Sequence, residues 1–256
     1  MSVTRPNLLK RKLKAGEAAL GFWLSTNSLA VTEMAAGAGW DWVLLDMEHT
    51  AYDVETVERH LLAAHHGGDA ELVVRVPSVD PALMKRLMDA GVRSYMFPYV
   101  DTDEEARLAV ATTRYPPHGV RGFAGGTRAT RFGRDADYLK TYADDVFVSI
   151  QIESARAIDA IPAYGTIDGI DAMLIGANDL AADLGHLGDT RHAAVVAKFD
   201  EAAAAIMATG KAAGFQFFDD RVKPLIARGF TFAAVEGDTH TLLGGMRASL
   251  ERLRQA

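Results

Sequence analysis

The stretch WVLLDMEHT, residues 42–50, begins as a continuous apolar run and ends in two acids and a histidine. A short apolar run of this kind is typical of a parallel strand that is covered on both faces. In a barrel of parallel strands, functional side chains gather at the carboxyl ends of the strands. The stretch therefore predicts a buried strand that delivers Asp46, Glu48 and His49 to one end of a parallel sheet.

Similar apolar runs recur along the chain and alternate with amphipathic helical patterns. Eight strands that alternate with helices predict an α/β fold, a (β/α)8 TIM barrel. A doubly wound open sheet remains the alternative, because alternation alone does not show that the sheet closes. The predicted strands are residues 19–25, 42–47, 72–76, 94–98, 146–152, 171–176, 214–218 and 231–236. The predicted helices are residues 29–37, 53–66, 80–90, 102–114, 154–160, 178–184, 193–213, 219–228 and 238–254.

The N-terminal segment and the connecting segments add to this prediction. An extra N-terminal helix is predicted at residues 6–14, where it could plug the bottom of the barrel. No linker or low-complexity segment divides the chain, so we expect a single domain over residues 1–256. One long irregular, arginine-rich segment is predicted at residues 114–137. A loop of this length in a compact domain is usually functional, interfacial or mobile.

The composition narrows the classes of function. The chain has 256 residues, 49% hydrophobic and 24% charged, with a net charge of −7. Nucleic acid binding is disfavoured, because it needs a basic face. The absence of cysteine excludes disulfides, thiol nucleophiles and Cys-ligated zinc. No apolar run approaches the ~20 residues that span a bilayer, and the N-terminus does not read as a signal peptide, so a cytoplasmic protein without a membrane partner is expected.

Two carboxylates from different strand ends, Glu153 and Asp179, could converge on a divalent cation. A hard cation such as Mg²⁺ or Mn²⁺ takes few protein carboxylates and leaves positions open for water and substrate. The alternative is that Asp179 only caps the next helix and that Glu153 is a first-turn acid favoured by the helix dipole. The spacing of the two residues leaves both interpretations open.

The pair Asp46 and His49 could act as an acid–base dyad in which the carboxylate orients the imidazole. The alternative is a solvated loop histidine, since the chain has eight histidines. Arg75 lies inside the apolar run LVVRVP, residues 72–77. A buried cation needs a protein carboxylate or an anionic ligand as its partner, and its strand-end position favours the ligand. The IGANDL turn, residues 175–180, offers backbone N–H groups as a seat for a small carboxylate.

The lysines bear on the type of chemistry. A Schiff-base aldolase needs a desolvated lysine on a strand that faces the barrel interior. No lysine of this chain falls in a predicted strand, so a Schiff-base lysine is not expected, and neither is pyridoxal phosphate. An aldolase on this scaffold would need a metal instead.

Five short motifs together resemble the class II, metal-dependent pyruvate aldolases of the 4-hydroxy-2-oxo-heptanedioate aldolase and citrate lyase-like family. The motifs occur in family order from about residue 6 to residue 245. They are LLDMEH (44–49), VVRVP (73–77), RYPPHGVRG (114–122), QIE (151–153) and GANDLAADLG (176–185). The resemblance implies a carbon–carbon lyase on a (β/α)8 barrel that reversibly cleaves 4-hydroxy-2-oxo acids to pyruvate and an aldehyde.

The resemblance also implies roles for individual residues. It implies a divalent metal (Mg²⁺, Mn²⁺ or Co²⁺) on Glu153 and Asp179, and an acid–base pair of His49 and Asp46 assisted by Arg75. Glu48 is expected behind the residues that contact the metal and the substrate. It further implies a homohexamer, a trimer of dimers, with the segment 114–134 at an interface. The residues expected to contact substrate are Trp23, Arg75, Gln151, Gly176, Ala177 and Asn178.

Two residues depart from the family pattern. Ala177 stands where proline is common, and Glu236 stands where glycine is common near the eighth strand. Two other functions stay open at this point. One is a related lyase that acts on an acyl-CoA thioester or another 2-oxo or hydroxy acid. The other is a non-enzymatic binder of small carboxylates, which would need Arg75 and the 175–180 turn but not His49.

Overall fold

The computed structural model describes residues 6–255 and contains a closed barrel of eight parallel strands in sequence order. The (β/α)8 prediction is therefore confirmed, and the open-sheet alternative is wrong because β1 pairs with β8. The single-domain prediction for residues 1–256 includes residues 1–5 and 256, which lie outside the described residues. The strands are β1 (Ala19–Leu24), β2 (Trp42–Asp46), β3 (Glu71–Arg75), β4 (Ser94–Phe97), β5 (Phe147–Ile152), β6 (Ala172–Ile175), β7 (Ala212–Gln216) and β8 (Phe232–Gly237).

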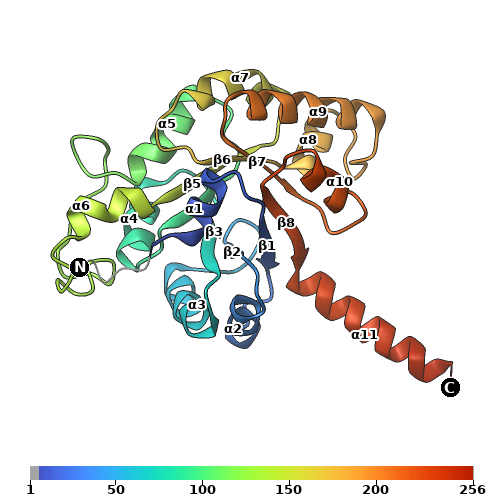
Figure 1. Cartoon of the computed structure of the whole chain (residues 1–256), viewed down its shortest axis with the longest axis horizontal. Helices are drawn as coiled ribbons and strands as arrows, with labels where there is room; N and C mark the ends of the chain where they lie inside the picture. Colours follow the sequence, from blue (N-terminus) through green and yellow to red (C-terminus); the bar gives the residue numbers. More distant parts are fainter. Residues whose placement is uncertain (1–5, 256) are drawn as a thin grey trace.

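Helices surround most of the barrel (Figure 1). They are α1 (Leu8–Lys14), α2 (Leu29–Gly37), α3 (Val54–Gly67), α4 (Pro81–Asp89), α5 (Asp103–Thr112), α6 (Tyr138–Asp145), α7 (Ala155–Gly165), α8 (Ala177–Asp183), α9 (Ala193–Ala208), α10 (Val222–Ala227) and α11 (Asp238–Arg254). Asp80 caps α4 with Pro81 in its first turn, as the sequence indicates. No helix among residues 6–255 is both long and apolar enough to cross a membrane.

Two apolar layers hold the fold together. Alternate strand residues point outward and pack against the helices, and the others fill the barrel interior. Inside the barrel, Trp42 stacks on Phe232 with ring centroids 4.3 Å apart. Gly21 faces this stack, and a Cβ added there would lie 2.1 Å from the Trp42 ring. The packed interior therefore leaves only the carboxyl ends of the strands for a site.

The N-terminal helix closes the opposite end of the barrel. Leu9 and Leu13 of α1 are buried against the interior residues of the strands, so the predicted plug is confirmed. Asn7 caps the helix and donates from Nδ2 to Ser94 Oγ at 2.9 Å, at the start of β4. Lys10 pairs with Asp171, which precedes β6, at 3.1 Å. These polar contacts fix α1 across the amino ends of several strands.

Three local predictions need correction. β7 begins at Ala212, two residues before the predicted 214–218, and α9 ends at Ala208 rather than at residue 213. The predicted helix was extended too far because the Ala and Gly residues around Gly210 do not show the β-branched or aromatic side chains that indicate a strand. Helix α6 at Tyr138–Asp145 was not predicted. It follows the irregular segment directly, and its eight residues are shorter than the window over which a helical period can be recognised.

Gly21→Ala should lower the free energy of unfolding by about 1–3 kcal/mol, because the added methyl group would overpack the barrel interior against Trp42. Urea denaturation of the purified protein measures the change. Gly126→Ala is the matched control, since a Cβ at Gly126 would meet nothing within 4 Å. Equal stabilities of the two variants would contradict this account of the interior.

Candidate active site

The carboxyl ends of the strands surround a cavity of about 260 Å³. Ten of the residues singled out in the sequence line it, which leaves Glu48 as the one predicted site residue outside the lining. They come from all parts of the chain, and the barrel brings them together. The lining residues are Trp23, Ser25, Asp46, His49, Arg75, Gln151, Glu153, Gly176, Ala177, Asn178, Asp179, Gln216, Phe218, Gly237 and Thr239.

A buried ion pair joins β2 to β3 at the floor of this pocket. Arg75 Nε donates to Asp46 Oδ1 at 2.9 Å, and Nη2 donates to Oδ2 at 2.6 Å. Parallel pairing places Asp46 directly beside Arg75 in the sheet register. The guanidinium also lies 4.8 Å from the centre of the Trp23 ring. Arg75 thus has a protein carboxylate as its partner, and it still faces the cavity where an anionic ligand could bind.

Asp46 accepts five hydrogen bonds at this end of the barrel. Besides Arg75, it accepts hydrogen bonds from Trp23 Nε1 at 3.2 Å and from the backbone N–H groups of Glu48 and His49 at 3.1 and 3.3 Å. Burial alone would raise the pKa of Asp46, but the bonds and charge of Arg75 outweigh it and hold the pKa below its usual value. Asp46 therefore stays ionised and fixes the turn that follows β2.

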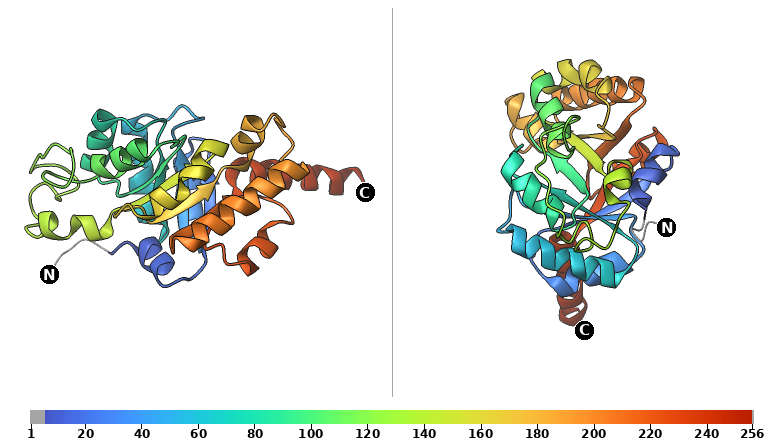
Figure 2. Two further views of the ribbon diagram at one scale, coloured as in Figure 1. Left: turned by 90° about the horizontal axis from the view of Figure 1, so that it is seen from above. Right: turned by 90° about the vertical axis from the view of Figure 1, so that its left-hand side faces the viewer.

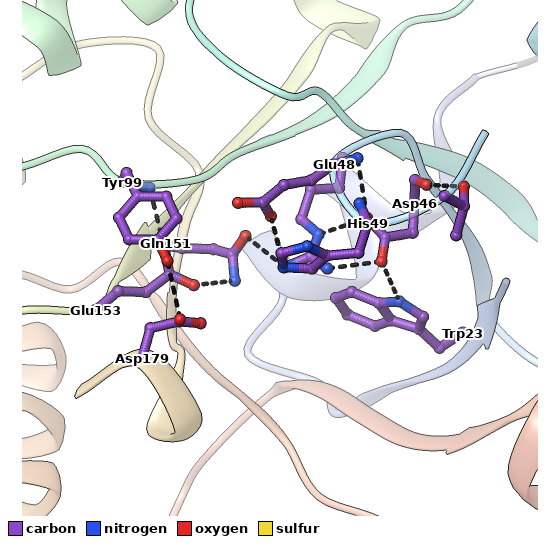
Figure 3. A network of polar contacts seen from close by, with 10 residues as sticks. Trp23, Asp46, Glu48, His49, Tyr99, Gln151, Glu153 and Asp179 are labelled. Carbon is purple, nitrogen blue, oxygen red and sulfur yellow. Dashed lines mark hydrogen bonds and ion pairs between the residues drawn. The ribbon is translucent and has the colours of Figure 1, made fainter. Parts of the chain in front are cut away.

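The geometry differs from the dyad expected in the sequence. The carboxylate of Asp46 contacts the backbone of His49, and the imidazole pairs with Glu48 instead (Figure 3). His49 Nε2 lies 3.8 Å from Glu48 Oε2, and the histidine side chain is 59% exposed. The difference arises because Arg75 occupies both oxygens of Asp46. Asp46 can therefore position His49 only through the main chain of the turn.

Glu48 connects the histidine to the arginine. Its Oε2 lies 2.8 Å from Arg75 Nη1 as an ion pair. Burial raises the pKa of Glu48, and the charges of Arg75 and His49 oppose that rise without cancelling it. Glu48 does not line the cavity but contacts two residues that do, His49 and Arg75.

A second group of acids lies across the cavity, at the ends of β5 and β6. Glu153 Oε1 accepts from Gln151 Nε2 at 2.7 Å, and Glu153 Oε2 accepts from the backbone N–H of Tyr99 at 3.0 Å. The Tyr99 hydroxyl donates to Asp179 Oδ1 at 2.8 Å (Figure 3). Gln151 also accepts from Arg75 Nη1 at 3.4 Å, and so it links the acids to the ion pair.

The electrostatics of this second group favour a cation. Burial raises the pKa of Glu153 to about 8, and the nearby charges of Asp179 and Glu48 add to the rise. The nearby charge of Arg75 lowers the pKa of Glu153, but Arg75 is already paired with Asp46 and Glu48. A divalent cation bound between Glu153 and Asp179 would relieve this repulsion.

The backbone also leaves room for these acids. A Cβ at Gly176 would lie 2.5 Å from Glu153 Cγ and Oε1, so only glycine allows the carboxylate to sit there. Among residues 6–255, no three His, Cys, Asp or Glu side chains form a group that could hold a metal. The two carboxylates that Tyr99 joins, Glu153 and Asp179, fit an open site in which water and substrate would complete the shell, as Mg²⁺ commonly requires.

Sequence reasoning missed several residues of the pocket. Tyr99 has a left-handed backbone, with φ of 47°, and bridges the two acids. It follows strand β4 directly in SYMFPY, so its place at a strand end was the available signal. Ser25, Gln216, Phe218, Gly237 and Thr239 complete the lining on the β1, β7 and β8 side.

The two acids at the end of β8 take different places. Asp238 is buried and accepts hydrogen bonds from the backbone of Ser25 and from both the backbone and the hydroxyl of Thr26. Glu236 lies outside the lining and pairs with His240, with Oε1 and Nδ1 2.6 Å apart. The acid that departs from the family pattern is thus directed to the neighbouring helix rather than to the cavity.

Known proteins are similar to this chain over nearly its whole length. A family model described as HpcH/HpaI aldolase/citrate lyase matches residues 19–243. A pyruvate aldolase of Rhizobium etli is 42% identical over 96% of this chain and 97% of its own. A hydroxypyruvate/pyruvate aldolase of Paraburkholderia phytofirmans is 40% identical over 98% of this chain and 99% of its own. A crystal structure of an HpcH/HpaI aldolase/citrate lyase family protein from Burkholderia cenocepacia, 39% identical, covers 97% of this chain and 99% of its own with a TM-score of 0.94. These matches confirm the resemblance seen in the motifs.

Asp46→Ala should lower the free energy of unfolding by about 3 kcal/mol, because it leaves the buried guanidinium of Arg75 with Glu48 alone. Chemical denaturation at neutral pH measures the loss. The difference from wild type should shrink in acid. The folded pKa of Asp46 lies below 3.8, so its contribution is complete above that pH and is lost as the pH falls through the folded value.

The control for this substitution is Asp200→Ala, which removes an exposed ion pair with Arg228. Half-exposed pairs contribute at most about 1 kcal/mol, so this variant should stay near wild type. The importance assigned to the Arg75 pair would be refuted if both variants lost the same stability.

Proposed function

The chain belongs to the HpcH/HpaI aldolase/citrate lyase family and is a carbon–carbon lyase, and we propose that it is a metal-dependent class II aldolase that reversibly cleaves 4-hydroxy-2-oxo acids to pyruvate and an aldehyde. The observation that carries the proposal is a single pocket in which Arg75 and the acids Glu153 and Asp179 face the same cavity. A cationic side chain and a cation-binding pair of acids suit a substrate with a carboxylate next to a keto group. Relatives named as pyruvate aldolases support the pyruvate half.

Glu153 and Asp179 would hold the divalent cation, Mg²⁺, Mn²⁺ or Co²⁺. When bound, such a cation supplies a Lewis acid that stabilises the enolate formed on cleavage. Tyr99 holds both carboxylates in place through its backbone N–H and its hydroxyl. Gln151 holds the remaining oxygen of Glu153, so the two acids present a fixed face to the cavity.

Arg75 and Gln151 would bind the 2-oxo acid. The guanidinium, fixed by Asp46, directs its charge toward the oxygen that becomes the enolate, which stabilises the developing negative charge. The main chain from Gly176 to Asn178 lines the same cavity and would contact the substrate carboxylate. Trp23 packs beside Arg75 and closes this side of the pocket. The pyruvate half would thus be held by groups that do not need to move.

His49 would be the acid–base residue. In the cleavage direction its imidazole takes the proton of the C4 hydroxyl as the C3–C4 bond breaks and the electron pair of that bond passes to the enolate. The aldehyde leaves, and the proton returned to C3 completes pyruvate. Glu48 lies 3.8 Å from the ring, and Asp46 fixes the main chain that carries it.

The aldehyde half would lie along the β1, β7 and β8 side of the pocket. Ser25, Gln216, Phe218 and Thr239 line it there, outside the network of charged residues. Three of these four side chains can form hydrogen bonds. An aldehyde with hydroxyl or other polar groups would therefore be accommodated better than a purely aliphatic one.

We propose a homohexamer, a trimer of dimers, as the assembled state. The arginine-rich segment and the start of α6 expose Val120, Phe123, Phe132 and Leu139 by 53–59% of their surfaces. Exposed apolar side chains gathered in one segment are typical of a contact surface between proteins. This supports the interface role expected for residues 114–134.

Removal of divalent cations should abolish pyruvate release from a 4-hydroxy-2-oxo acid, and added Mn²⁺, Co²⁺ or Mg²⁺ should restore it. The reason is that Glu153 and Asp179 repel each other and leave the enolate unstabilised without a cation. A coupled assay that reduces pyruvate to lactate measures the release. Full activity in excess chelator would remove the metal from the proposal.

His49→Ala should reduce the rate of cleavage by about 10²–10⁴-fold, as expected for loss of a general acid–base group. The same coupled assay measures it, with cation affinity measured separately by calorimetry and expected to be unchanged. His66→Ala is the control, because His66 is exposed on α3 and pairs with Glu33 away from the pocket. A loss smaller than tenfold at His49 would assign the proton transfer to another group.

A further inference from the structure

A fully buried histidine lies on α3, outside the cavity and outside the proposed reaction. Helices α2 and α3 lie side by side on the outside of the barrel (Figures 1 and 2), and His60 of α3 contacts Thr32 of α2 between them. Burial lowers the pKa of His60, so its imidazole is neutral at physiological pH. A buried polar ring needs a hydrogen-bond partner for each of its nitrogens.

Both ring nitrogens of His60 have such partners, and together these define its tautomer. Nε2 lies 3.0 Å from Oδ1 of Asn27, an oxygen that can only accept a hydrogen bond. Nε2 therefore carries the proton, and Nδ1 accepts from the hydroxyl of Thr32 at 2.7 Å. The ring thus connects α2, through Thr32, to the loop after β1, through Asn27.

Asn27 is held by its backbone as well as by its side chain. Its φ of 48° is left-handed, a conformation that asparagine tolerates better than most residues other than glycine. Its backbone N–H donates to the hydroxyl of Tyr52 at 3.0 Å. Tyr52 packs edge-on against His60, with ring centroids 5.1 Å apart. Two aromatic side chains in mutual contact therefore fix Asn27.

The loop that contains Asn27, residues 25–28, forms part of the pocket wall. Ser25 lines the cavity on the side proposed for the aldehyde. Asp238 accepts from the backbone N–H groups of Ser25 and Thr26 at 3.0 and 2.9 Å. Asn27 follows directly, where the chain turns toward α2. The loop is therefore held from the β8 side by Asp238 and from the α3 side at Asn27.

Hydrogen bonds rather than packing fix this part of the loop. Thr26 and Asn27 are exposed, and a segment with few buried apolar contacts opens locally at a low free energy. The turn that carries His49 is fixed separately, through the bond from its backbone to Asp46. Loss of the link between His60 and Asn27 should therefore loosen the loop after β1 without displacing His49.

We propose that His60 is a positioning residue for the aldehyde half of the substrate, and that it acts through Asn27 on the loop that carries Ser25. This inference rests on the proposed aldolase reaction. The side chain of His60 does not line the cavity, so its effect reaches the substrate only through the position of the loop. The affinity for the aldehyde depends on this link, whereas pyruvate and the cation bind on the opposite side of the pocket.

The first experiment removes the polar ring of His60. His60→Leu should raise the KM for glycolaldehyde in the condensation with pyruvate by about 2–10-fold, the factor that corresponds to one hydrogen bond. The KM for pyruvate and kcat should stay near wild type. His60→Gln should restore the KM for glycolaldehyde, because its amide can donate to Asn27 and accept from Thr32.

Leu61→Ala is the matched control for this substitution. Leu61 is the next residue of α3 and is buried in the outer core, so its truncation lowers stability and leaves the link from His60 to Asn27 in place. This variant should keep the wild-type KM for glycolaldehyde. An unchanged KM in His60→Leu, or an equal rise in Leu61→Ala, would overturn the proposal.

The second experiment is a double-mutant cycle. Asn27→Gly removes the acceptor for His60 and tolerates the left-handed backbone, and its exposed position should allow the variant to fold. Alone it should raise the KM for glycolaldehyde as much as His60→Leu does. The two substitutions together should raise it no further, because they remove the same link. Additive effects would show that His60 acts through packing of the helices, contrary to the proposal.

The third experiment measures the loop without the reaction. The backbone N–H groups of Ser25, Thr26 and Asn27 are all hydrogen-bonded, so their deuterium uptake, measured by mass spectrometry, reports opening of the loop. Uptake should be about 2–10-fold faster in His60→Leu and Asn27→Gly than in wild type or His60→Gln. Equal uptake in all four proteins would contradict the link. A wild type without aldolase activity would refute the proposed function instead, since the uptake still decides whether His60 holds the loop.

Discussion

The guanidinium of Arg75 is buried at the carboxyl end of β3, so its positive charge needs a negatively charged partner inside the barrel. The balance comes from Asp46 on the adjacent strand, whose two oxygens match the planar fork of the guanidinium. Burying such an ion pair costs free energy unless the oxygens of the carboxylate find further hydrogen-bond donors. Here Trp23 and the backbone of the turn after β2 donate to Asp46. The same bonds that balance Arg75 therefore also shape the turn that presents His49.

This pairing divides the pocket into two electrostatic halves. Because Arg75 is held by Asp46 and Glu48, little of its charge remains to neutralise Glu153 and Asp179 across the cavity. Burial raises the pKa of Glu153 to about 8, and the charge of Arg75 offsets only part of that rise. Gln151 spans the two halves with one oxygen toward Arg75 and one nitrogen toward Glu153, and so fixes their separation. A ligand with adjacent acidic and carbonyl oxygens, together with a cation, complements both halves at once.

The sequence predicted the barrel and most of the pocket because both depend on local patterns. Apolar runs that end in polar residues mark the strand ends, and closure of the barrel brings those ends together. What it could not predict depends on contacts between distant segments. Tyr99 reaches Asp179 only through a left-handed backbone after β4. The Asp46 carboxylate might have faced either the His49 ring or Arg75 by spacing alone, and the sheet register, which aligns Asp46 with Arg75, decides between them. Helix α11 was predicted as a helix, but its periodicity does not reveal that it projects from the barrel.

The root of α11 forms part of the pocket wall. Gly237 and Thr239 line the cavity on either side of Asp238, and Asp238 holds the loop that carries Ser25, another lining residue. The position of this wall therefore depends on one carboxylate that ties the end of β8 to the loop after β1. The acids that would hold the cation lie at the ends of β5 and β6 and are fixed by Tyr99 and Gln151 instead. The side of the pocket proposed for the aldehyde and the side proposed for pyruvate are thus held by separate sets of hydrogen bonds.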